Sequence, residues 1–342
     1  MTVERGRIPA MTDVAKLAGV SLQTVSRVIN GHRSVSPGTR LRVQTAMREL
    51  GYRPNRAAQA LASGRSDIIG VVAEPSTQYG PTSTLRAVEQ AAAASGLTVS
   101  VTSVPTMDRE TIAEAIDRLL EQRVRGIVFV ALVASVHEAI TAMDPGVPIV
   151  TIGPEHRPGV ASVSIDHAKG GRIAVRVLLE AGHQTVWHVG GPPDAFDSQE
   201  RAHGWRAALL DAGKEVPPVI AGDWTAGGGH RAGSVLARMP EVTAIFASND
   251  RTALGVLRAL HEHGHDVPGD VSVFGFDDID EAEFFIPPLT TIRQDFALVG
   301  RRAMATLLPL LAGEPPRHEL LAPELVLRDS VGPPPGGHRR SD

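Results

Sequence analysis

Short apolar runs alternate with amphipathic segments over most of the chain, from Ile68 to about residue 330. Between most of these runs lie 10–18 residues whose apolar positions recur at helical spacing. Such alternation of strand and helix predicts parallel sheets covered by helices on both faces. A break in the pattern around residues 153–165 suggests two similar lobes. The expected strands occupy residues 68–72, 97–104, 126–130, 148–152, 185–190, 244–248 and 271–276.

The first 53 residues follow a different pattern, that of three short helices. The first helix has Thr12 or Asp13 as its cap and stops at Gly19. The third helix starts at Ser36 and stops at Gly51. The positions expected to face inward are Val14, Leu17 and Ala18 in the first helix and Leu41, Met47 and Leu50 in the third.

The second helix lies within "GVSLQTVSRVIN", residues 19–30, and has one apolar and one polar side. Ser21 is its predicted N-cap, because a serine hydroxyl can accept a hydrogen bond from an unpaired N–H of the first turn. So short a helix needs neighbours, and a helix, a turn with glycine and a second helix form a helix-turn-helix. The apolar side carries Val25, Val28 and Ile29, and the other side carries Leu22, Gln23, Ser26, Arg27 and Asn30.

The polar side of this helix suits the edges of DNA bases. A recognition helix enters the major groove with its N-terminal residues over the bases. Gln23 can pair with adenine, Arg27 can reach guanine, and Leu22 can contact a thymine methyl group.

Charge is unevenly distributed and supports this interpretation. Residues 1–65 contain 11 Lys and Arg against 3 Asp and Glu, a net charge of +8, whereas residues 66–342 contain 23 against 35, a net charge of −12. This asymmetry indicates a basic module that binds a polyanion, joined to a body that does not. The chain has no cysteine and no apolar segment typical of a secretory signal, and its longest apolar stretch, at 126–136, is 11 residues. We therefore expect a cytoplasmic, soluble protein with no disulfide and no membrane span.

Sequence motifs in both parts of the chain resemble those of one known protein family. The stretch "MTDVAKLAGVSLQTVSRVINGHRSVSPGTRLRVQTAMRELGYRPNRAAQALASGRS" resembles the DNA-binding head and hinge of the lactose-repressor family. The likeness continues through "GDWTAGG", "SNDRTALGVLRAL", "SVFGFDDI" and "PPLTTIRQDFALVG" to about residue 328. It implies an all-α helix-turn-helix head and an α/β, two-lobed, periplasmic-binding-protein-like effector domain with parallel sheets. The expected divisions are a DNA-binding domain at 1–53, a hinge helix and linker at 54–66, an effector and dimerisation domain at 67–330 and a disordered tail at 331–342.

The resemblance also assigns residues to DNA. Leu22, Gln23 and Arg27 correspond to the base readers, although Leu22 stands where the founding member of the family has tyrosine. Leu61 corresponds to a leucine that each subunit inserts into the minor groove, where an apolar wedge kinks the duplex. The hinge around it, with Pro54 before barely two helical turns, is too short to fold alone. The remaining candidates for DNA contact or helix packing are Ser21, Thr24, Ser26, Asn30, Asn55 and Ala58.

A sugar is the expected ligand of the effector domain. Ligands of open α/β sheets bind beyond the carboxyl ends of the strands, which in a two-lobed domain means the cleft. Carboxylate, amide and guanidinium groups around an indole suit a pyranose, whose hydroxyls need hydrogen bonds and whose ring face stacks. Gly153 stands where the founding member has a cleft aspartate, and Glu74 replaces a small residue. By resemblance and chemistry the expected ligand-binding residues are Glu74, Arg201, Trp224, Asn249, Asp277 and Phe296.

Three other motifs do not support an enzyme or a metal site. "HEHGH" at 261–265 matches H-E-x-x-H, but Gly264 is a natural helix stop that leaves His265 outside the helix. "FDDID" lacks the spaced ligands of a calcium loop, and "TAGGGH" lacks the G-K-[ST] ending of a P-loop. We expect no catalytic residues, no metal and no cofactor.

The sequence thus predicts a transcriptional repressor of a carbohydrate-utilisation operon. A sugar inducer, a galactoside or another glycoside or oligosaccharide, would release it from a pseudo-palindromic, double-stranded operator on the nucleoid. Because only a Pro/Gly-rich tail follows Arg328, without the tetramerising helix of the founding member, we expect a homodimer. The alternative is a sugar solute-binding protein without a DNA-binding role, which would need export and leaves the basic head unexplained.

Overall fold

The computed structural model describes residues 9–30, 32, 34–53, 66–106, 108–130, 145–153 and 160–336. The chain divides into two compact units, Met1–Ser66 and Asp67–Asp342. The predicted hinge helix, with Asn55, Ala58 and Leu61, lies outside the described residues. None of the helices within these ranges is long and apolar enough to cross a membrane.

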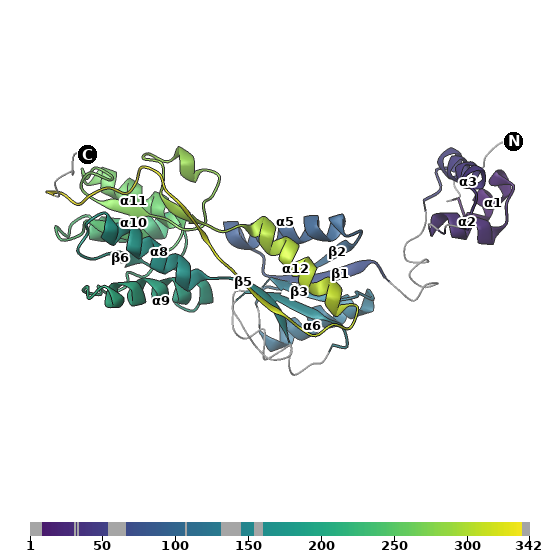
Figure 1. The fold of residues 1–342 in the computed structure, drawn as a ribbon, viewed down its shortest axis with the longest axis horizontal. Coiled ribbons are helices and arrows are strands. Elements are labelled where there is room, and N and C mark those ends of the chain that lie inside the picture. The colour runs from purple at the N-terminus through teal and green to yellow at the C-terminus, as the bar shows by residue number, and fades with distance from the viewer. Residues whose placement is uncertain are drawn as a thin grey trace. The chain divides into compact units, whose positions relative to one another are not determined.

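The first unit contains three short helices around one small core (Figure 1). Ser21 caps α2 as predicted, because its Oγ accepts a hydrogen bond from Thr24 N at 3.2 Å. Ser36 does the same for α3, accepting from Thr39 N at 3.3 Å. The helices are α1 (Met11–Ala18), α2 (Leu22–Ile29) and α3 (Pro37–Leu50).

Two expectations for this unit were wrong. The N-cap of α1 is Ala10, and Asp13 lies in the first turn with its carboxylate accepting from Ala10 N at 2.8 Å. Leu17 and Leu41 are 49% and 60% exposed rather than inward. Valines and alanines fill the core instead, because small side chains let short helices cross closely; they are Val14, Ala15, Ala18, Val25, Val28, Val43 and Ala46.

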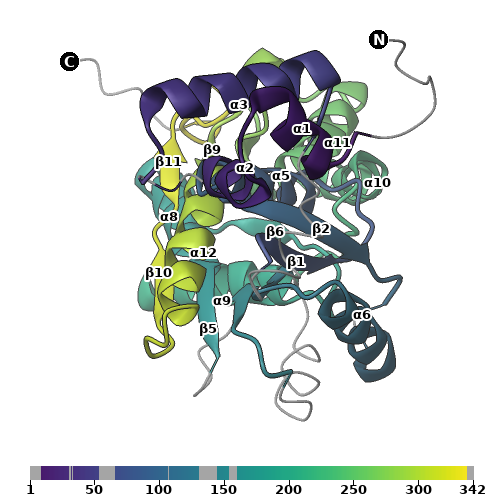
Figure 2. The ribbon, with the colours of Figure 1, turned by 90° about the vertical axis from the view of Figure 1, so that its right-hand side faces the viewer.

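The second unit has two lobes, and the first lobe is built on a six-stranded parallel sheet. The strand order is β10-β5-β4-β3-β1-β2, so that β10, from late in the chain, pairs with β5 at one edge (Figure 2). The strands are β1 (Ile68–Ala73), β2 (Thr98–Ser103), β3 (Ile127–Val130), β4 (Ile149–Ile152), β5 (Ala161–Ile165) and β10 (His318–Leu321).

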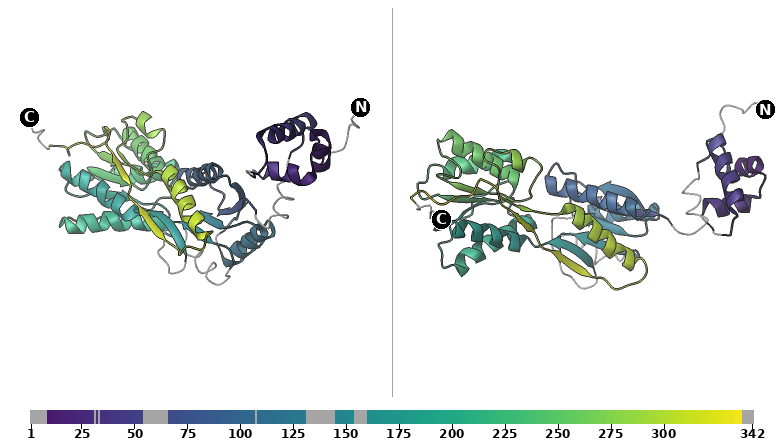
Figure 3. Two further views of the ribbon diagram at one scale, coloured as in Figure 1. Left: turned by 45° about the vertical axis from the view of Figure 1, so that its right-hand side comes forward. Right: turned by 45° about the horizontal axis from the view of Figure 1, so that its top comes forward.

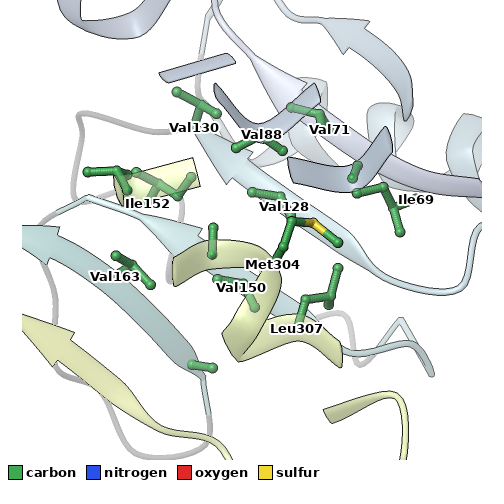
Figure 4. Packing of buried hydrophobic residues seen from close by; sticks show 14 of the residues in the cluster. Ile69, Val71, Val88, Val128, Val130, Val150, Ile152, Val163, Met304 and Leu307 are labelled. Atoms are coloured by element: carbon green, nitrogen blue, oxygen red, sulfur yellow. The ribbon is translucent and has the colours of Figure 1, made fainter. Parts of the chain in front are cut away.

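Alternate residues of these strands face opposite layers of helix. Ile69 and Val71 pack under α5 (Tyr79–Ala94) and α12 (Phe296–Leu310), in the cluster that Figure 4 shows. Val72 points to the other face and packs against α6 (Arg109–Glu121). Because both faces of the sheet are buried, most of these strands appear in the sequence as continuous apolar runs.

The second lobe has a smaller parallel sheet of order β6-β7-β8, also covered on both faces. Its strands are β6 (Trp187–Val189), β7 (Ala244–Ala247) and β8 (Ser272–Phe274). One face packs against α8 (His167–Glu180) and α9 (Phe196–Asp211), and the other against α10 (Ala226–Leu236) and α11 (Asp250–Glu262). A short 3-10 helix, η1 (Ala282–Phe284), and an antiparallel pair, β9 (Thr291–Arg293) and β11 (Glu324–Val326), complete the lobe.

The lobes exchange chain segments, which the apolar pattern did not predict. The chain crosses between them after β5, again between β9 and α12, and again between β10 and β11 (Figure 3). The expected break at 153–165 therefore contains β5, a strand of the first lobe. Strands β5, β9, β10 and β11 were missed because they have three to five residues and mix apolar with polar ones.

The first residues of the predicted tail, Val331 and Gly332, pack on the second lobe and are not disordered. Val331 packs on the core of the second lobe, and Gly332 N donates to Ser272 Oγ at 3.0 Å. The carbonyl of Gly332 lies 3.0 Å from Nε2 of His183. These contacts attach the chain beyond residue 330 to the second lobe.

Candidate functional site

A cavity in the second unit has a wall formed by both lobes. As the topology predicts, several of its residues follow parallel strands at their carboxyl ends: Gly153 follows β4, Asn249 follows β7, and Asp277 follows β8. The first lobe contributes Gln78, Tyr79, Gly80, Pro81, Thr84, Val130, Ile152, Gly153, Ser164, Ile165, Phe296 and Val299. The second lobe and the segments that cross to it contribute His167, Asp197, Arg201, Trp224, Asn249, Asp277 and Gln294.

Five of the six residues expected to bind ligand lie together in this wall: Arg201, Trp224, Asn249, Asp277 and Phe296. Glu74 does not, since it is exposed on the loop after β1 and does not line the cavity. Other polar residues of the wall were not predicted from the sequence, above all His167, Asp197 and Gln294. Asp197 precedes Arg201 by one helical turn, a spacing that places both on one face of α9 and could have identified it.

Arg201 is the central cation of the wall and is only 4% exposed. Its guanidinium lies 3.9 Å from the ring centroid of Phe276, in a cation–π contact. Its Nη1 donates to the carbonyl of Ser248 and lies 3.5 Å from Asp277 Oδ1, and its Nε donates to His167 Nδ1 at 3.3 Å. These contacts hold the guanidinium in one orientation.

Asp277 lies opposite Arg201, in left-handed backbone conformation at φ 112°. Its Oδ1 accepts a hydrogen bond from Gln294 Nε2 at 2.6 Å. Burial raises the pKa of Asp277 to about 6, although Arg201 and the Gln294 hydrogen bond oppose that rise. Asp250, at the start of α11, has a pKa well above its usual range because of burial and the charge of Asp277. It accepts from Ile279 N at 2.9 Å and Thr291 Oγ1 at 2.6 Å.

His167 connects Arg201 to Asp197. Burial lowers the pKa of His167 to about 4, so the imidazole is neutral at pH 7. Because the Arg201 guanidinium can only donate, Nδ1 of His167 must accept, and the ring proton lies on Nε2. Nε2 lies 3.2 Å from Asp197 Oδ1 and therefore donates to it. The contact is a hydrogen bond from a neutral ring rather than an ion pair.

Trp224 and Asn249 form another part of the wall. Trp224 has a left-handed backbone at φ 61°, and its carbonyl accepts from Asn249 Nδ2 at 3.2 Å. Asn249 Oδ1 also caps α11 by accepting from Thr252 N at 2.8 Å. The indole lies over Gly191, where a Cβ atom would come 2.1 Å from Trp224 Nε1. Gly191 therefore leaves the space that the indole occupies.

The first unit presents the predicted polar surface on α2. Val25 and Val28 are buried, whereas Leu22, Gln23 and Arg27 are exposed, as the periodicity predicted. Ser21 is committed to its capping hydrogen bond, and its Oγ also lies 2.9 Å from Thr24 Oγ1. Asn30 Nδ2 donates to Ser26 Oγ at 3.4 Å. The exposed side chains of Leu22 and Gln23 in the first turn and Arg27 in the last turn are thus the candidates to contact a partner.

The H-E-x-x-H match is not a metal site. Helix α11 ends at Glu262, and His265 lies beyond it, with Nε2 2.8 Å from the carbonyl of Ala237. Glu262 instead contacts His230 at 2.7 Å and Arg258 at 2.6 Å. Within the ranges that the structure describes, no three His, Cys, Asp or Glu side chains are grouped closely enough to hold a metal ion.

Comparison with known proteins gives two family matches. Residues 10–55 match the model for bacterial regulatory proteins of the lacI family, and residues 175–331 match the model for a periplasmic binding protein-like domain. The chain is 36% identical to the lactose operon repressor of Escherichia coli (strain K12), over 93% of this chain and 89% of that protein.

Solved structures agree along nearly the whole chain. The lac repressor dimer bound to operator and the anti-inducer ONPF superposes with a TM-score of 0.87 at 34% identity, covering 95% of this chain and 100% of that one. The complex of the transcriptional regulator CelR with cellobiose superposes with a TM-score of 0.70 at 34% identity, covering 94% and 99%. The helix-turn-helix, the two lobes with parallel sheets and these matches together establish that the chain belongs to the LacI family of bacterial regulatory proteins, which are DNA-binding transcriptional regulators and not enzymes.

Proposed function

We propose that the protein is a transcriptional repressor that binds a pseudo-palindromic operator as a homodimer and leaves it when a sugar occupies the cavity. The observation that carries the proposal is the exposed side of α2, where Gln23 and Arg27 stand on the second helix of a helix-turn-helix. In that motif such side chains reach base edges in the major groove, and two-fold dimers match two half-sites. The net charge of +8 on residues 1–65 supports binding to the phosphate backbone.

Within α2, Leu22, Gln23 and Arg27 are the proposed base readers. Ser21, Thr24, Ser26 and Asn30 then support the helix or contact phosphates, since their hydroxyl and amide groups are already hydrogen-bonded within the helix. The proposed hinge contacts of Asn55, Ala58 and Leu61 rest on the family resemblance alone. The repressor would act on the nucleoid in the cytoplasm.

The proposed effector is a glycoside or oligosaccharide. The cavity combines an indole with guanidinium, carboxylate and amide groups, which is the chemistry that a pyranose needs. The relatives named above are a lactose operon repressor and a regulator in complex with cellobiose. A β-linked disaccharide or a galactoside is accordingly the first effector to test on this chain.

In the proposed mechanism, sugar binding in the cavity is coupled to DNA binding by the helix-turn-helix unit. A sugar that contacts both lobes changes their relative arrangement, which separates the two hinge segments of a dimer and weakens operator binding. Such coupling is typically worth about 1–3 kcal/mol and is reciprocal, so operator DNA must weaken sugar binding by the same factor.

The test uses the full-length protein and a fluorescent operator selected from a random DNA library. Fluorescence anisotropy should show specific binding that weakens steeply with salt, because phosphate contacts release counterions. Lactose and cellobiose, titrated into the complex, should release the DNA. A protein that binds sugar but no DNA would be a solute-binding protein, and the proposal would be wrong. Tighter DNA binding in the presence of sugar would mean that the sugar raises operator affinity, and the sugar would then be a corepressor.

A further inference from the structure

Charge is distributed unequally over the two halves of the cavity wall. The described residues that the first lobe contributes carry no formal charge, and six of them have apolar side chains: Pro81, Val130, Ile152, Ile165, Phe296 and Val299. All charged members of the described wall, Asp197, Arg201 and Asp277, belong to the second lobe. A ligand that fits both halves has a hydroxyl-rich end at the second lobe and a less polar end at the first.

The single guanidinium among these residues is largely committed inside the lobe. Arg201 donates through Nη1 to the Ser248 carbonyl and through Nε to His167 Nδ1, contacts Asp277 and covers the ring of Phe276. A phosphate or carboxylate is often held by two parallel N–H donors of one arginine. Nη2 is the part of the Arg201 guanidinium left for an anionic ligand, and it lies 4.0 Å from Asp197 Oδ2, whose carboxylate would repel that ligand.

Asp197 has acceptor capacity left. Its side chain is 13% exposed, and its Oδ1 accepts a hydrogen bond from His167 Nε2 at 3.2 Å. Its Oδ2 lies 4.0 Å from Arg201 Nη2, which is beyond hydrogen-bond distance. An ionised carboxylate can accept about four hydrogen bonds. His167 thus orients a carboxylate whose second oxygen remains available to donors on a ligand.

We propose that Asp197, oriented by His167, is the specificity-determining residue of the cavity and restricts it to uncharged, hydroxyl-rich glycosides. Sugar hydroxyls donate to the carboxylate of Asp197, whereas the phosphate or carboxylate of an acidic sugar meets two carboxylates, Asp197 and Asp277, against the one guanidinium of Arg201. This inference rests on the proposed function, because it assumes that the cavity is the effector site.

The test uses matched pairs of 4-nitrophenyl glycosides and full-length protein. Each pair differs only at C6: β-glucoside against β-glucuronide, and β-galactoside against β-galacturonide. Calorimetry should show binding of at least one neutral member, and its acidic partner should bind at least about 100-fold more weakly, since like charges in a buried site repel strongly. An acidic member that binds as tightly as its neutral partner would overturn the inference.

The variant Asp197→Asn removes the charge and keeps an acceptor for His167. It should weaken binding of the neutral glycoside by about 10-fold or more, because a hydrogen bond to a charged acceptor is stronger than one to an amide. The difference in affinity between the neutral glycoside and its acidic partner should also become smaller. Asp194→Asn is the matched control, an exposed aspartate three residues earlier that does not line the cavity. Equal affinities of Asp197→Asn and wild type would overturn the role of Asp197.

Operator binding, measured on the same preparations, separates this inference from the proposed function. A protein that binds its operator but no neutral glycoside of the panel would overturn the inference and leave DNA binding intact. A protein that discriminates between the pairs as expected but binds no DNA would support the inference and contradict the repressor.

Discussion

The surface of α2 and the cavity of the second unit are assembled in opposite ways. The side chains of α2 and its two caps that we propose for DNA lie within ten consecutive residues, 21–30, and are mostly exposed. The cavity draws on segments between residues 78 and 299, and its charged side chains, Asp197, Arg201 and Asp277, are largely buried and contact one another or His167. A surface built from one helix depends on local structure, whereas a cavity built from many segments depends on the whole fold.

This difference predicts how each region responds to substitution. Replacement of an exposed residue of α2 should alter a binding partner and leave stability nearly unchanged. Replacement of a buried, paired residue of the cavity should alter stability as well as ligand binding, because the charge of its partner is then buried without a counter-charge. Four experiments test this contrast.

The largest expected effect is that of Arg201→Met. The substitution leaves the buried carboxylates of Asp277 and Asp197 without their cation, which should destabilise the second unit by about 3–5 kcal/mol. Thermal unfolding of the full-length protein measures it. Arg206→Met, at an exposed position of the same helix, is the control and should shift the melting temperature little. Equal melting temperatures for the two variants would show that Arg201 does not compensate these charges.

A smaller effect is expected for Gln23→Ala, and on DNA binding rather than stability. Loss of one bidentate contact to a base costs up to about 3 kcal/mol, so the affinity for the selected operator should fall by roughly 10- to 100-fold. Non-specific DNA binding and glycoside binding should stay as in wild type. Gln44→Ala, an exposed glutamine of α3, is the control. A variant with lower affinity for all DNA sequences alike would argue against base reading by Gln23.

Next in size is a pH effect from His188, which is buried beside Phe246 and Trp205 in the second lobe. Burial lowers the pKa of His188 to about 4. Because the unfolded chain takes up this proton near pH 6.5, the folded state loses stability as pH falls from about 6.5 toward 4. Between pH 7.5 and 5 this loss amounts to about 2 kcal/mol.

His188→Phe should remove that part of the acid sensitivity. Asp277, whose pKa is raised to about 6, works in the opposite sense between about pH 4 and 6, but does so in both proteins. The difference between the two pH profiles of unfolding free energy therefore isolates His188. Parallel profiles would contradict the buried, neutral imidazole.

The smallest expected effect is that of Ser21→Ala. Loss of the N-cap of α2 should cost about 1 kcal/mol of local stability in the first unit. Faster hydrogen exchange of the α2 amides would measure it, and Ser21→Asp, which retains a capping acceptor, should restore protection. Glycoside affinity of the second unit should not change. Exchange rates like those of wild type would show that the cap contributes little.

Prediction from sequence succeeded where a few consecutive residues suffice. The seven apolar runs became strands, Ser21 and Ser36 became caps, and α2 exposed the side that its periodicity indicated. It failed for Leu17 and Leu41, since helix crossing, and not the apolar character of a residue, decides which side chains meet. It also missed β5, β9, β10 and β11, whose short mixed sequences become strands only because the fold brings a neighbouring strand alongside to pair with.

Some residues of the cavity could likewise be predicted from the sequence, and others could not. Arg201, Trp224, Asn249, Asp277 and Phe296 could be named because their types suit a sugar and their segments resemble a known family. Glu74 was named for the same reason, yet its side chain lies outside the wall. His167 and Gln294 carry no motif, and they belong to the site only because chain crossings bring them beside Arg201 and Asp277.

The sequence by itself determined the helix-turn-helix, the alternation of strand and helix and the chemistry available to the cavity, because local spacing and residue type encode all three. Only the tertiary structure decided which polar groups face one another, which of them are buried, and therefore which are charged. A pKa depends on neighbours contributed by distant segments, as for Asp277 beside Arg201 and Gln294. The residues proposed to bind DNA thus lie in one continuous stretch of the chain, whereas the proposed sugar site forms only when the second unit folds.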